Sequence, residues 1–327
     1  MGAKSCRLWL LGLMCGLFAL SAQARDADCR SGLRPEISFI SFLSLNIAVQ
    51  PPEPLEIKGK LSLPLRFDFR KRCFVVGSAL PAVLVLHGSA GVDSRGDFYA
   101  RALNAAGIAT LEIDMWEARH VSGPDNRPAA PIFTYPDVFA ALAFLSAHPN
   151  IAPQRIGVLG FSWGGVVSLE AAETLYAGMF GHDSSGNPLR FAAHVANYPV
   201  CWGANMDFSQ YGFPPPAQFG SQLLHLTGAP MLVQIGSEDD YDNGSAHCRA
   251  LVDELNATNN GVVQLAEYPG AYHAWDRLMV PISIKDPFGD EGSIFRTGVA
   301  PSVEIVPDVD QAYASRLRVV AFFRQKL

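Results

Sequence analysis

Short apolar runs alternate with amphipathic segments along most of this chain. Residues 82–86 read Ala-Val-Leu-Val-Leu, a continuous apolar run that is typical of a strand buried on both faces. Similar runs predict further strands at residues 109–113, 156–159, 191–197, 230–235 and 262–268. Between them, helices are expected at residues 96–106, 135–147, 166–175, 246–257 and 309–325. This repeated alternation predicts an α/β protein with a mostly parallel, doubly wound sheet.

The segment before residue 80 has a different pattern. Residues 36–72 carry alternating and β-rich stretches, which include Glu36–Phe42 and Leu61–Phe69. The prolines at positions 51, 52 and 54 lie between these two stretches. Because proline in a sheet is confined to edges and bends, the region predicts an antiparallel edge at the N-terminal end of the fold.

The helix expected at residues 309–325 is amphipathic and would close the fold. An amphipathic helix turns its apolar stripe toward the core. The positions expected to make the core contacts are Ala312, Leu317, Val320 and Phe323.

The first 24 residues are patterned as a secretory signal peptide. A basic start precedes an apolar run from Leu8 to Leu20, and an Ala-x-Ala site ends at Ala24. The apolar run is shorter than the roughly 20 residues that a spanning helix needs. We therefore expect cleavage after residue 24. Residues 25–327 would form one domain, periplasmic or secreted, without a stable membrane anchor.

The charge of the chain argues against nucleic acid as a partner. The first 24 residues hold two of the 25 basic residues and none of the 31 acidic ones. Residues 25–327 therefore hold 23 basic and 31 acidic residues, and their formal charge is −8. No basic run or patch is visible in the sequence. Cysteine and histidine show no close spacing of the kind that holds zinc, so no metal site is expected.

Four of the six cysteines remain after such a cleavage, namely Cys29, Cys73, Cys201 and Cys248. An even number in an exported chain favours disulfide bonds over free thiols. Four cysteines allow three pairings. One of these joins Cys29 to Cys73 and Cys201 to Cys248, and the sequence does not choose among the three.

Ser162 is the candidate nucleophile. It stands in Gly160-Phe161-Ser162-Trp163-Gly164, between an apolar run and a helix-like segment. A G-x-S-x-G in this context is typical of a nucleophile elbow, in which a sharp and strained turn exposes the serine hydroxyl. The motif alone is a hypothesis, and it gains weight only if an acid and a histidine follow in the right order.

A glycine-rich turn at His87–Gly91 follows the strand expected at residues 82–86. Such a turn can aim one backbone N–H into the site, and the residue after the nucleophile supplies a second. We therefore expect the N–H groups of Ser89 and Trp163 to hold the oxyanion of a tetrahedral intermediate. The His87 side chain is expected to be structural.

The acid and the base follow the last two expected strands. Asp239 comes after the strand at residues 230–235 and is the expected acid, with Asp240 as the alternative. His273 lies on the loop after the strand at residues 262–268 and is the expected general base. The order Ser162, Asp239, His273 is that of α/β-hydrolases.

Three strings in this sequence resemble those of the dienelactone hydrolase family of α/β-hydrolases: Leu86–Gly91, Gly160–Gly165 and Tyr268–Trp275. The resemblance runs from about Pro81 to the closing helix. It implies an α/β-hydrolase fold, a serine or cysteine nucleophile with His and Asp, and hydrolysis of esters or lactones without a cofactor.

This sequence departs from the founding members of that family, which are short cytosolic proteins with a cysteine nucleophile. It has a serine, a signal peptide and N-terminal strands, and exported relatives with serine resemble it better. Two extra loops, Trp202–Leu226 and Arg277–Pro307, are expected to cover and reshape the pocket.

Several side chains near the expected strand ends are candidates for substrate contact. The aromatic ones could line an apolar acyl or aryl pocket, although ordinary core packing is at least as common for each. Arg119 could receive a substrate carboxylate in bidentate fashion, or form a surface ion pair. The candidates are Trp116, Arg119, Trp202, Tyr241 and Trp275.

These patterns favour an exported serine hydrolase that cleaves a small or medium carboxylic ester or lactone through an acyl-enzyme. A peptidase related to prolyl oligopeptidase is the alternative enzyme, although no propeller-like repeat is visible in the sequence. A non-catalytic binding protein with a hydrolase fold is the alternative from another class. It has no need of a serine, an acid and a histidine at these three places.

Overall fold

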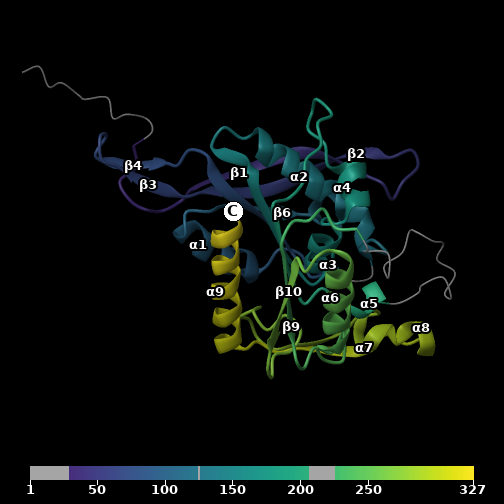
Figure 1. Ribbon diagram of the computed structural model, residues 1–327. Helices are drawn as coiled ribbons and strands as arrows, with labels where there is room; N and C mark the ends of the chain where they lie inside the picture. Colours follow the sequence, from purple (N-terminus) through teal and green to yellow (C-terminus); the bar gives the residue numbers. More distant parts are fainter. Residues whose placement is uncertain (1–28, 124–125, 206–224) are drawn as a thin grey trace, which may run out of the picture.

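The computed structural model describes residues 29–123, 126–205 and 225–327. A central sheet of eight strands runs through the molecule (Figure 1). Its order is β1 (Glu36–Asn46), β2 (Glu53–Leu63), β6 (Ala109–Asp114), β5 (Leu80–Leu86), β7 (Ile151–Phe161), β8 (Ala193–Asn197), β9 (Met231–Gly236) and β10 (Val263–Tyr268). The strands from β6 to β10 pair in parallel, whereas β1 and β2 are antiparallel. The predicted α/β class and its antiparallel N-terminal edge are confirmed.

Helices cover both faces of the sheet (Figure 1). One face carries α1 (Ser94–Ala105) and α9 (Val309–Lys326), and the other carries α2 (Tyr135–Ala147), α3 (Trp163–Glu170), α4 (Thr174–Phe180) and α6 (Ala246–Thr258). Strand β5 shows why its sequence is apolar at every position. Val83 and Val85 pack with side chains of α1 and α9, while Leu84 and Leu86 pack with those of α2 and α3.

The remaining elements are short. They are the hairpin of β3 (Leu65–Asp68) and β4 (Cys73–Val76), the pair β11 (Ile282–Lys285) and β12 (Ser302–Ile305), the helices α5 (Trp202–Asn205), α7 (Gly289–Gly292) and α8 (Ile294–Thr297), and the 3-10 turns η1 (Glu117–Arg119) and η3 (Pro131–Thr134). A disulfide joins Cys29 to Cys73 and ties the start of the described chain to the β3–β4 hairpin.

Two predicted segments differ from those observed. Strand β7 begins at Ile151 rather than at residue 156. The helix predicted at residues 166–175 is divided, because α3 ends at Glu170 and α4 begins at Thr174. The side chain of Glu173 accepts a hydrogen bond from the backbone N–H of Leu175, and it caps the second helix in the manner of an N-cap acid.

The prediction for α9 was wrong at one position. Ala312 and Phe323 are buried as expected, but Leu317 is 65% exposed. The observed stripe uses Ala312, Val319, Phe322 and Phe323, with Ser315 between them. Leu317 lies outside this stripe, because helical positions pack against one surface only at spacings of three and four residues.

The signal peptide predicted at residues 1–24 lies outside the described residues. Within the described ranges, no helix combines the length and the apolar character that crossing a bilayer requires.

Candidate active site

Ser162 lies at the sharp turn between β7 and α3. Its backbone has φ 52° and ψ −111°, a left-handed conformation that residues other than glycine rarely adopt. The turn closes so tightly that a Cβ on Gly160 would clash with the backbone of Gly164 and Gly165. A Cβ on Gly164 would lie 2.5 Å from the carbonyl oxygen of Leu86. The glycines of the G-x-S-x-G string are therefore required by backbone contact.

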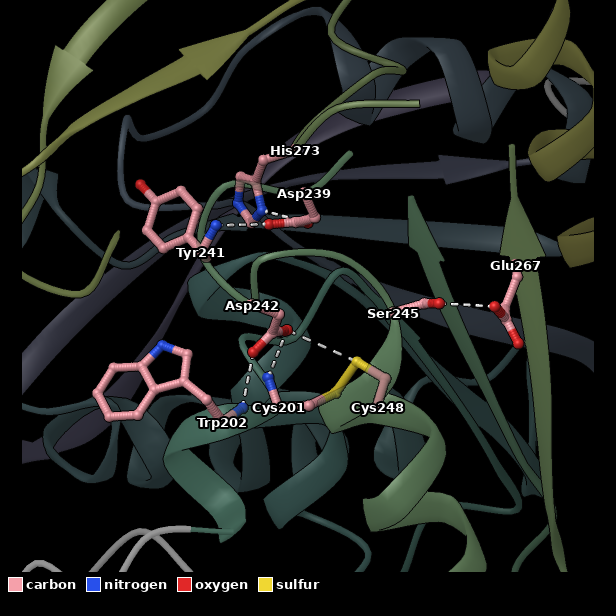
Figure 2. The surroundings of a disulfide bond; sticks show 9 residues. All are labelled: Cys201, Trp202, Asp239, Tyr241, Asp242, Ser245, Cys248, Glu267 and His273. Atoms are coloured by element: carbon pink, nitrogen blue, oxygen red, sulfur yellow. Dashed lines mark hydrogen bonds and ion pairs between the residues drawn. A yellow bond between two sulfur atoms is a disulfide. The ribbon is translucent and has the colours of Figure 1, made fainter. Parts of the chain in front are cut away.

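Three polar side chains form a hydrogen-bonded chain at this turn. The Oγ of Ser162 lies 2.9 Å from Nε2 of His273, and Nδ1 of His273 lies 2.8 Å from Oδ2 of Asp239. All three residues are buried. The other oxygen of Asp239 accepts a hydrogen bond from the backbone N–H of Tyr241 at 2.9 Å, which fixes the carboxylate (Figure 2). Sequence reasoning proposed these three residues, and the structure brings them together.

The neighbouring carboxylate of Asp240 points elsewhere. Its Oδ2 accepts a hydrogen bond from the backbone N–H of Glu304 at 2.7 Å. Asp240 therefore fastens the segment around β12 to the acid loop, and the contact with His273 belongs to Asp239.

Aromatic rings hold the imidazole of His273 from two sides. The ring of Tyr241 lies 4.1 Å from it between centroids, and that of Tyr198 lies 4.8 Å away in an edge-on arrangement. A ring between two rigid neighbours loses rotational freedom before any substrate arrives, which favours a fixed geometry for proton transfer.

The two expected oxyanion donors face the same pocket. Ser89 and Trp163 both line it together with Ser162. Among the described residues, no acceptor is bound to the backbone N–H of either one. The side chain of His87 contacts backbone groups instead, since its Nε2 accepts a hydrogen bond from the N–H of Met115 at 2.9 Å and its Nδ1 lies 2.8 Å from the carbonyl oxygen of Gly88. This buried histidine holds the turn in place, as expected of a structural residue.

The pocket beside Ser162 has mostly apolar walls. About 660 Å³ of space lies between its walls when the open solvent at its mouth is included. Trp202 and Tyr241, both proposed from the sequence, line it. Asp286 and Phe288 also line it, and they come from the extra segment 277–307. Most of the other extra loop, residues 206–224, lies outside the described residues.

Two of the proposed aromatic residues support the pocket rather than line it. Trp116 is buried, donates from Nε1 to the carbonyl oxygen of Ser89 at 3.1 Å, and packs edge-on against Trp163. Trp275 is fully buried beneath Tyr198 and Tyr268. Neither residue lines the pocket, and both fit the alternative of core packing.

Arg119 was also wrong as a substrate ligand, and it is no surface ion pair either. Its guanidinium is buried and forms a bidentate pair with Asp137, with one N–O distance of 2.6 Å. It also donates to the carbonyl oxygens of Met115 and Phe133. These acceptors use its donors, so no substrate carboxylate can reach them.

Sequence reasoning missed a second buried ion pair at the pocket wall. Arg127 binds Asp286 through two contacts of 2.9 Å, and its guanidinium lies over the rings of Trp163 and Phe288. This pair joins the loop before α2 to the extra segment 277–307. Nothing local in the sequence indicates a pair whose members are 159 residues apart.

A buried polar network behind His273 was missed as well. Asp276 accepts hydrogen bonds from the hydroxyl groups of Tyr198 and of Tyr99, the latter at 2.7 Å. Arg95, itself buried, donates to the hydroxyl of Tyr198 at 3.3 Å. Burial raises the pKa of the Asp276 carboxyl, while Arg95 opposes that shift. Tyr198 thus links this network to the ring of His273.

The second disulfide joins Cys201, which lines the pocket, to Cys248 (Figure 2). Asp242 lies beside it and accepts hydrogen bonds from the backbone N–H groups of Cys201 and Trp202, at 2.8 and 2.7 Å. Burial, with a contribution from nearby Asp239, raises the pKa of Asp242 to about 8. The observed disulfides, Cys29–Cys73 and Cys201–Cys248, together form one of the three pairings that four cysteines allow, and it is the pairing named in the sequence analysis.

Within the described ranges, one group of potential metal ligands is found, and it consists of Cys201, Asp242 and Cys248. Their donor atoms lie within 4.8 Å of one another. The two sulfur atoms are bonded to each other, however, and a disulfide sulfur is no thiolate ligand. This cluster is therefore not a metal centre in the oxidised protein.

Comparisons with known proteins show which sequences this chain resembles. A family model described as the prolyl oligopeptidase family matches residues 132–280. An uncharacterized protein of Pseudomonas aeruginosa is 32% identical over 93 residues, which is 28% of this chain and 25% of that protein. A probable 2-oxo-3-(5-oxofuran-2-ylidene)propanoate lactonase of a Bradyrhizobium species is 32% identical over 108 residues, 31% of this chain and 44% of that protein. The matches thus span under half the length of these curated relatives.

Solved structures match over most of the chain. A putative dienelactone hydrolase from Klebsiella pneumoniae has a TM-score of 0.51 at 18% identity, covering 88% of this chain and 99% of that one. A hyperthermophilic esterase from Pyrobaculum calidifontis has a TM-score of 0.54 at 15% identity, and the match covers 89% of this chain and 85% of that one. Esterase 2 of Thermogutta terrifontis, phosphorylated by paraoxon, has a TM-score of 0.55 at 14% identity, and the match covers 86% of this chain and 92% of that one. The chain therefore has the α/β-hydrolase fold, and its structural neighbours include dienelactone hydrolase-like and esterase proteins.

Proposed function

We propose that this protein is a serine hydrolase that cleaves a carboxylic ester or lactone through an acyl-enzyme intermediate. The observation that carries the proposal is the hydrogen-bonded chain from Asp239 through His273 to Ser162, with the serine at a strained turn in a mostly apolar pocket. Such a chain is the arrangement that nucleophilic acyl transfer requires.

Each group has a role in the proposed reaction. Ser162 attacks the carbonyl carbon while Nε2 of His273 takes its proton, and Asp239 holds the other ring nitrogen and stabilises the imidazolium. The N–H groups of Ser89 and Trp163 hold the negative oxygen, and one such donor lowers the barrier by about 2.7–4 kcal/mol. The imidazolium then protonates the leaving alcohol. Water, activated by the same histidine, attacks the acyl-enzyme and releases the acid.

The likenesses support this reaction class. The neighbours that match over most of the chain carry the names of dienelactone hydrolase or esterase, and one curated relative is named a probable lactonase. An apolar pocket with few polar groups also suits the uncharged arm of an ester.

Turnover of 4-nitrophenyl acetate by the purified protein tests the proposal. We expect saturable hydrolysis that falls by several orders of magnitude in Ser162→Ala. A folded wild-type protein without activity on a range of esters and lactones would overturn it and would favour a non-catalytic binding protein.

A peptidase is the second candidate, because the matching family model is that of prolyl oligopeptidase. Ester and amide substrates with the same acyl group discriminate the two enzymes. We expect turnover of the ester without measurable turnover of the matched 4-nitroanilide or of prolyl amides, and efficient cleavage of prolyl amides would favour the peptidase.

We further propose that residues 25–327 form one exported domain, periplasmic or secreted. Two disulfides support this, because such bonds persist chiefly in oxidising compartments. N-terminal sequencing of the protein from its host is the test, with cleavage after residue 24 as the expected result.

A further inference from the structure

A buried carboxyl group lines the pocket and has no part in the reaction above. Glu170 is the last residue of α3 and is only 4% exposed, yet it lines the same pocket as Ser162. Within the part of the chain that the structure describes, no hydrogen bond or ion pair reaches its side chain. A carboxyl group with so little contact with water normally has such a partner.

The stripe of α3 that lines the pocket leads from the nucleophile to this carboxyl. It consists of Ser162, Trp163, Val166, Leu169 and Glu170. The spacing of three and four residues places these positions on one side of the helix. Eight residues at 1.5 Å each put Glu170 about 12 Å along the helix from Ser162.

The surroundings of Glu170 are acidic. Burial and the nearby Glu173 carboxylate raise the pKa of Glu170 to about 8. The hydroxyls of Tyr135 and Tyr176 are the other titratable groups in electrostatic contact with it, and the burial of both raises their own pKa. No cation among the described residues offsets this field. Burial and Glu173 therefore favour the protonated form of Glu170 at neutral pH, and a cation that enters the pocket would favour its ionised form.

We propose that Glu170 is a specificity-determining residue, and that the preferred substrate carries an ammonium group at the end of an arm lying along α3. The inference rests on the proposed esterase function. An ammonium group supplies the missing donor and the missing countercharge together, whereas a hydroxyl supplies only the donor. The formal net charge of residues 25–327, −8, also attracts cationic substrates.

Matched esters test the proposal by turnover. The first series is 4-nitrophenyl 8-aminooctanoate, 8-hydroxyoctanoate and nonanoate, which differ only at the last position. A second series carries the same three ends on the alcohol arm, and acid release is measured. We expect kcat/KM for the ammonium ester to exceed that for the methyl-ended ester by about tenfold or more in one of the series.

Each variant is judged by the ratio of its kcat/KM for the ammonium ester to its kcat/KM for the methyl-ended ester. This ratio does not depend on the fraction of the variant that is folded. Glu170→Leu should lower the ratio of ammonium to methyl kcat/KM below one. Glu170→Gln keeps the shape but cannot ionise, and it should lose most of the ammonium preference. Glu254→Gln, at an exposed position of α6, should keep the wild-type ratio. Equal or inverted preference in both wild-type series, or an unchanged ratio in Glu170→Leu, would overturn the proposal.

A binding measurement separates this proposal from the esterase proposal. Octylammonium is titrated into Ser162→Ala protein at pH 7 in buffers of different ionisation enthalpy. We expect binding with release of up to about one proton, because the protonated carboxyl must ionise, and loss of both in Glu170→Leu. Proton-linked binding by a protein that hydrolyses no ester would sink the esterase proposal alone. Ester hydrolysis without such binding would sink the Glu170 proposal alone.

Discussion

Nδ1 of His273 lies 2.8 Å from a carboxylate oxygen of Asp239, and the adjacent residue, Asp240, bonds to the backbone of Glu304 instead. Two acids that the sequence could not separate thus have different partners. One orients an imidazole, and the other fastens a loop.

This difference predicts unequal effects of two matched substitutions. Asp239→Asn should lower kcat by about three to four orders of magnitude, because an amide favours the wrong imidazole tautomer. Asp240→Asn should change kcat by less than about tenfold, since it has no contact with His273. Steady-state kinetics on 4-nitrophenyl acetate measures both. The opposite order of effects would move the acid role to Asp240.

The buried pair of Arg119 and Asp137 is expected to stabilise the fold. Arg119→Ala leaves a buried carboxyl without its countercharge, and the free energy of unfolding should fall by about 3–5 kcal/mol. The exposed pair of Arg249 and Glu267 is the control, and Arg249→Ala should cost less than about 1 kcal/mol. Urea unfolding measures both. Equal losses in the two variants would contradict the buried assignment.

The two disulfides separate stability from substrate binding. They close segments of similar length, with sequence separations of 44 and 47, so the entropy of the unfolded chain changes by similar amounts. Replacing either pair by serine should cost about 2–4 kcal/mol. Only the loss of Cys201–Cys248 should raise KM, because Cys201 lines the pocket. A rise in KM on removal of Cys29–Cys73 instead would show that the pocket depends on the N-terminal edge.

The raised pKa of Glu170 predicts how stability changes with pH. The native state holds a proton up to about pH 8, whereas the unfolded chain loses it near the ordinary value of 4.5. The stability from this group is therefore present below pH 4.5 and is lost as pH rises toward 8, by up to about 1.4 kcal/mol per pH unit. Glu170→Gln should remove this part of the slope.

Urea unfolding between pH 5 and pH 8 measures this slope, with Glu254→Gln as the exposed control. The control should keep the slope of the wild type. An identical slope in Glu170→Gln would mean that the carboxyl is ionised in the native protein.

The parts of the fold that could be predicted depend on local pattern. The run at residues 82–86 is apolar at every position because both faces of β5 are covered, and this was visible in the sequence. The turn at Ser162 was visible as well, because backbone contact demands glycine at fixed positions around it.

The misses depend on rotation about an element or on distant pairing. Leu317 is apolar and close to the right spacing, yet the rotation of α9 leaves it exposed. Arg119 was assigned from its chemistry alone, and Asp137, which takes up its donors, lies on another element. Arg127 and Asp286 meet only after the extra segment 277–307 has folded over the pocket. Local sequence patterns do not indicate contacts between residues that are far apart in the chain.

The most direct test of the catalytic assignment is covalent labelling with a fluorophosphonate, followed by peptide mass mapping. The probe reacts with a serine only where a base activates the hydroxyl and an oxyanion site receives the phosphoryl oxygen. A single adduct on Ser162, absent from Ser162→Ala and strongly reduced in His273→Ala, is the expected result. A folded wild-type protein that takes up no label at Ser162 would contradict the assignment.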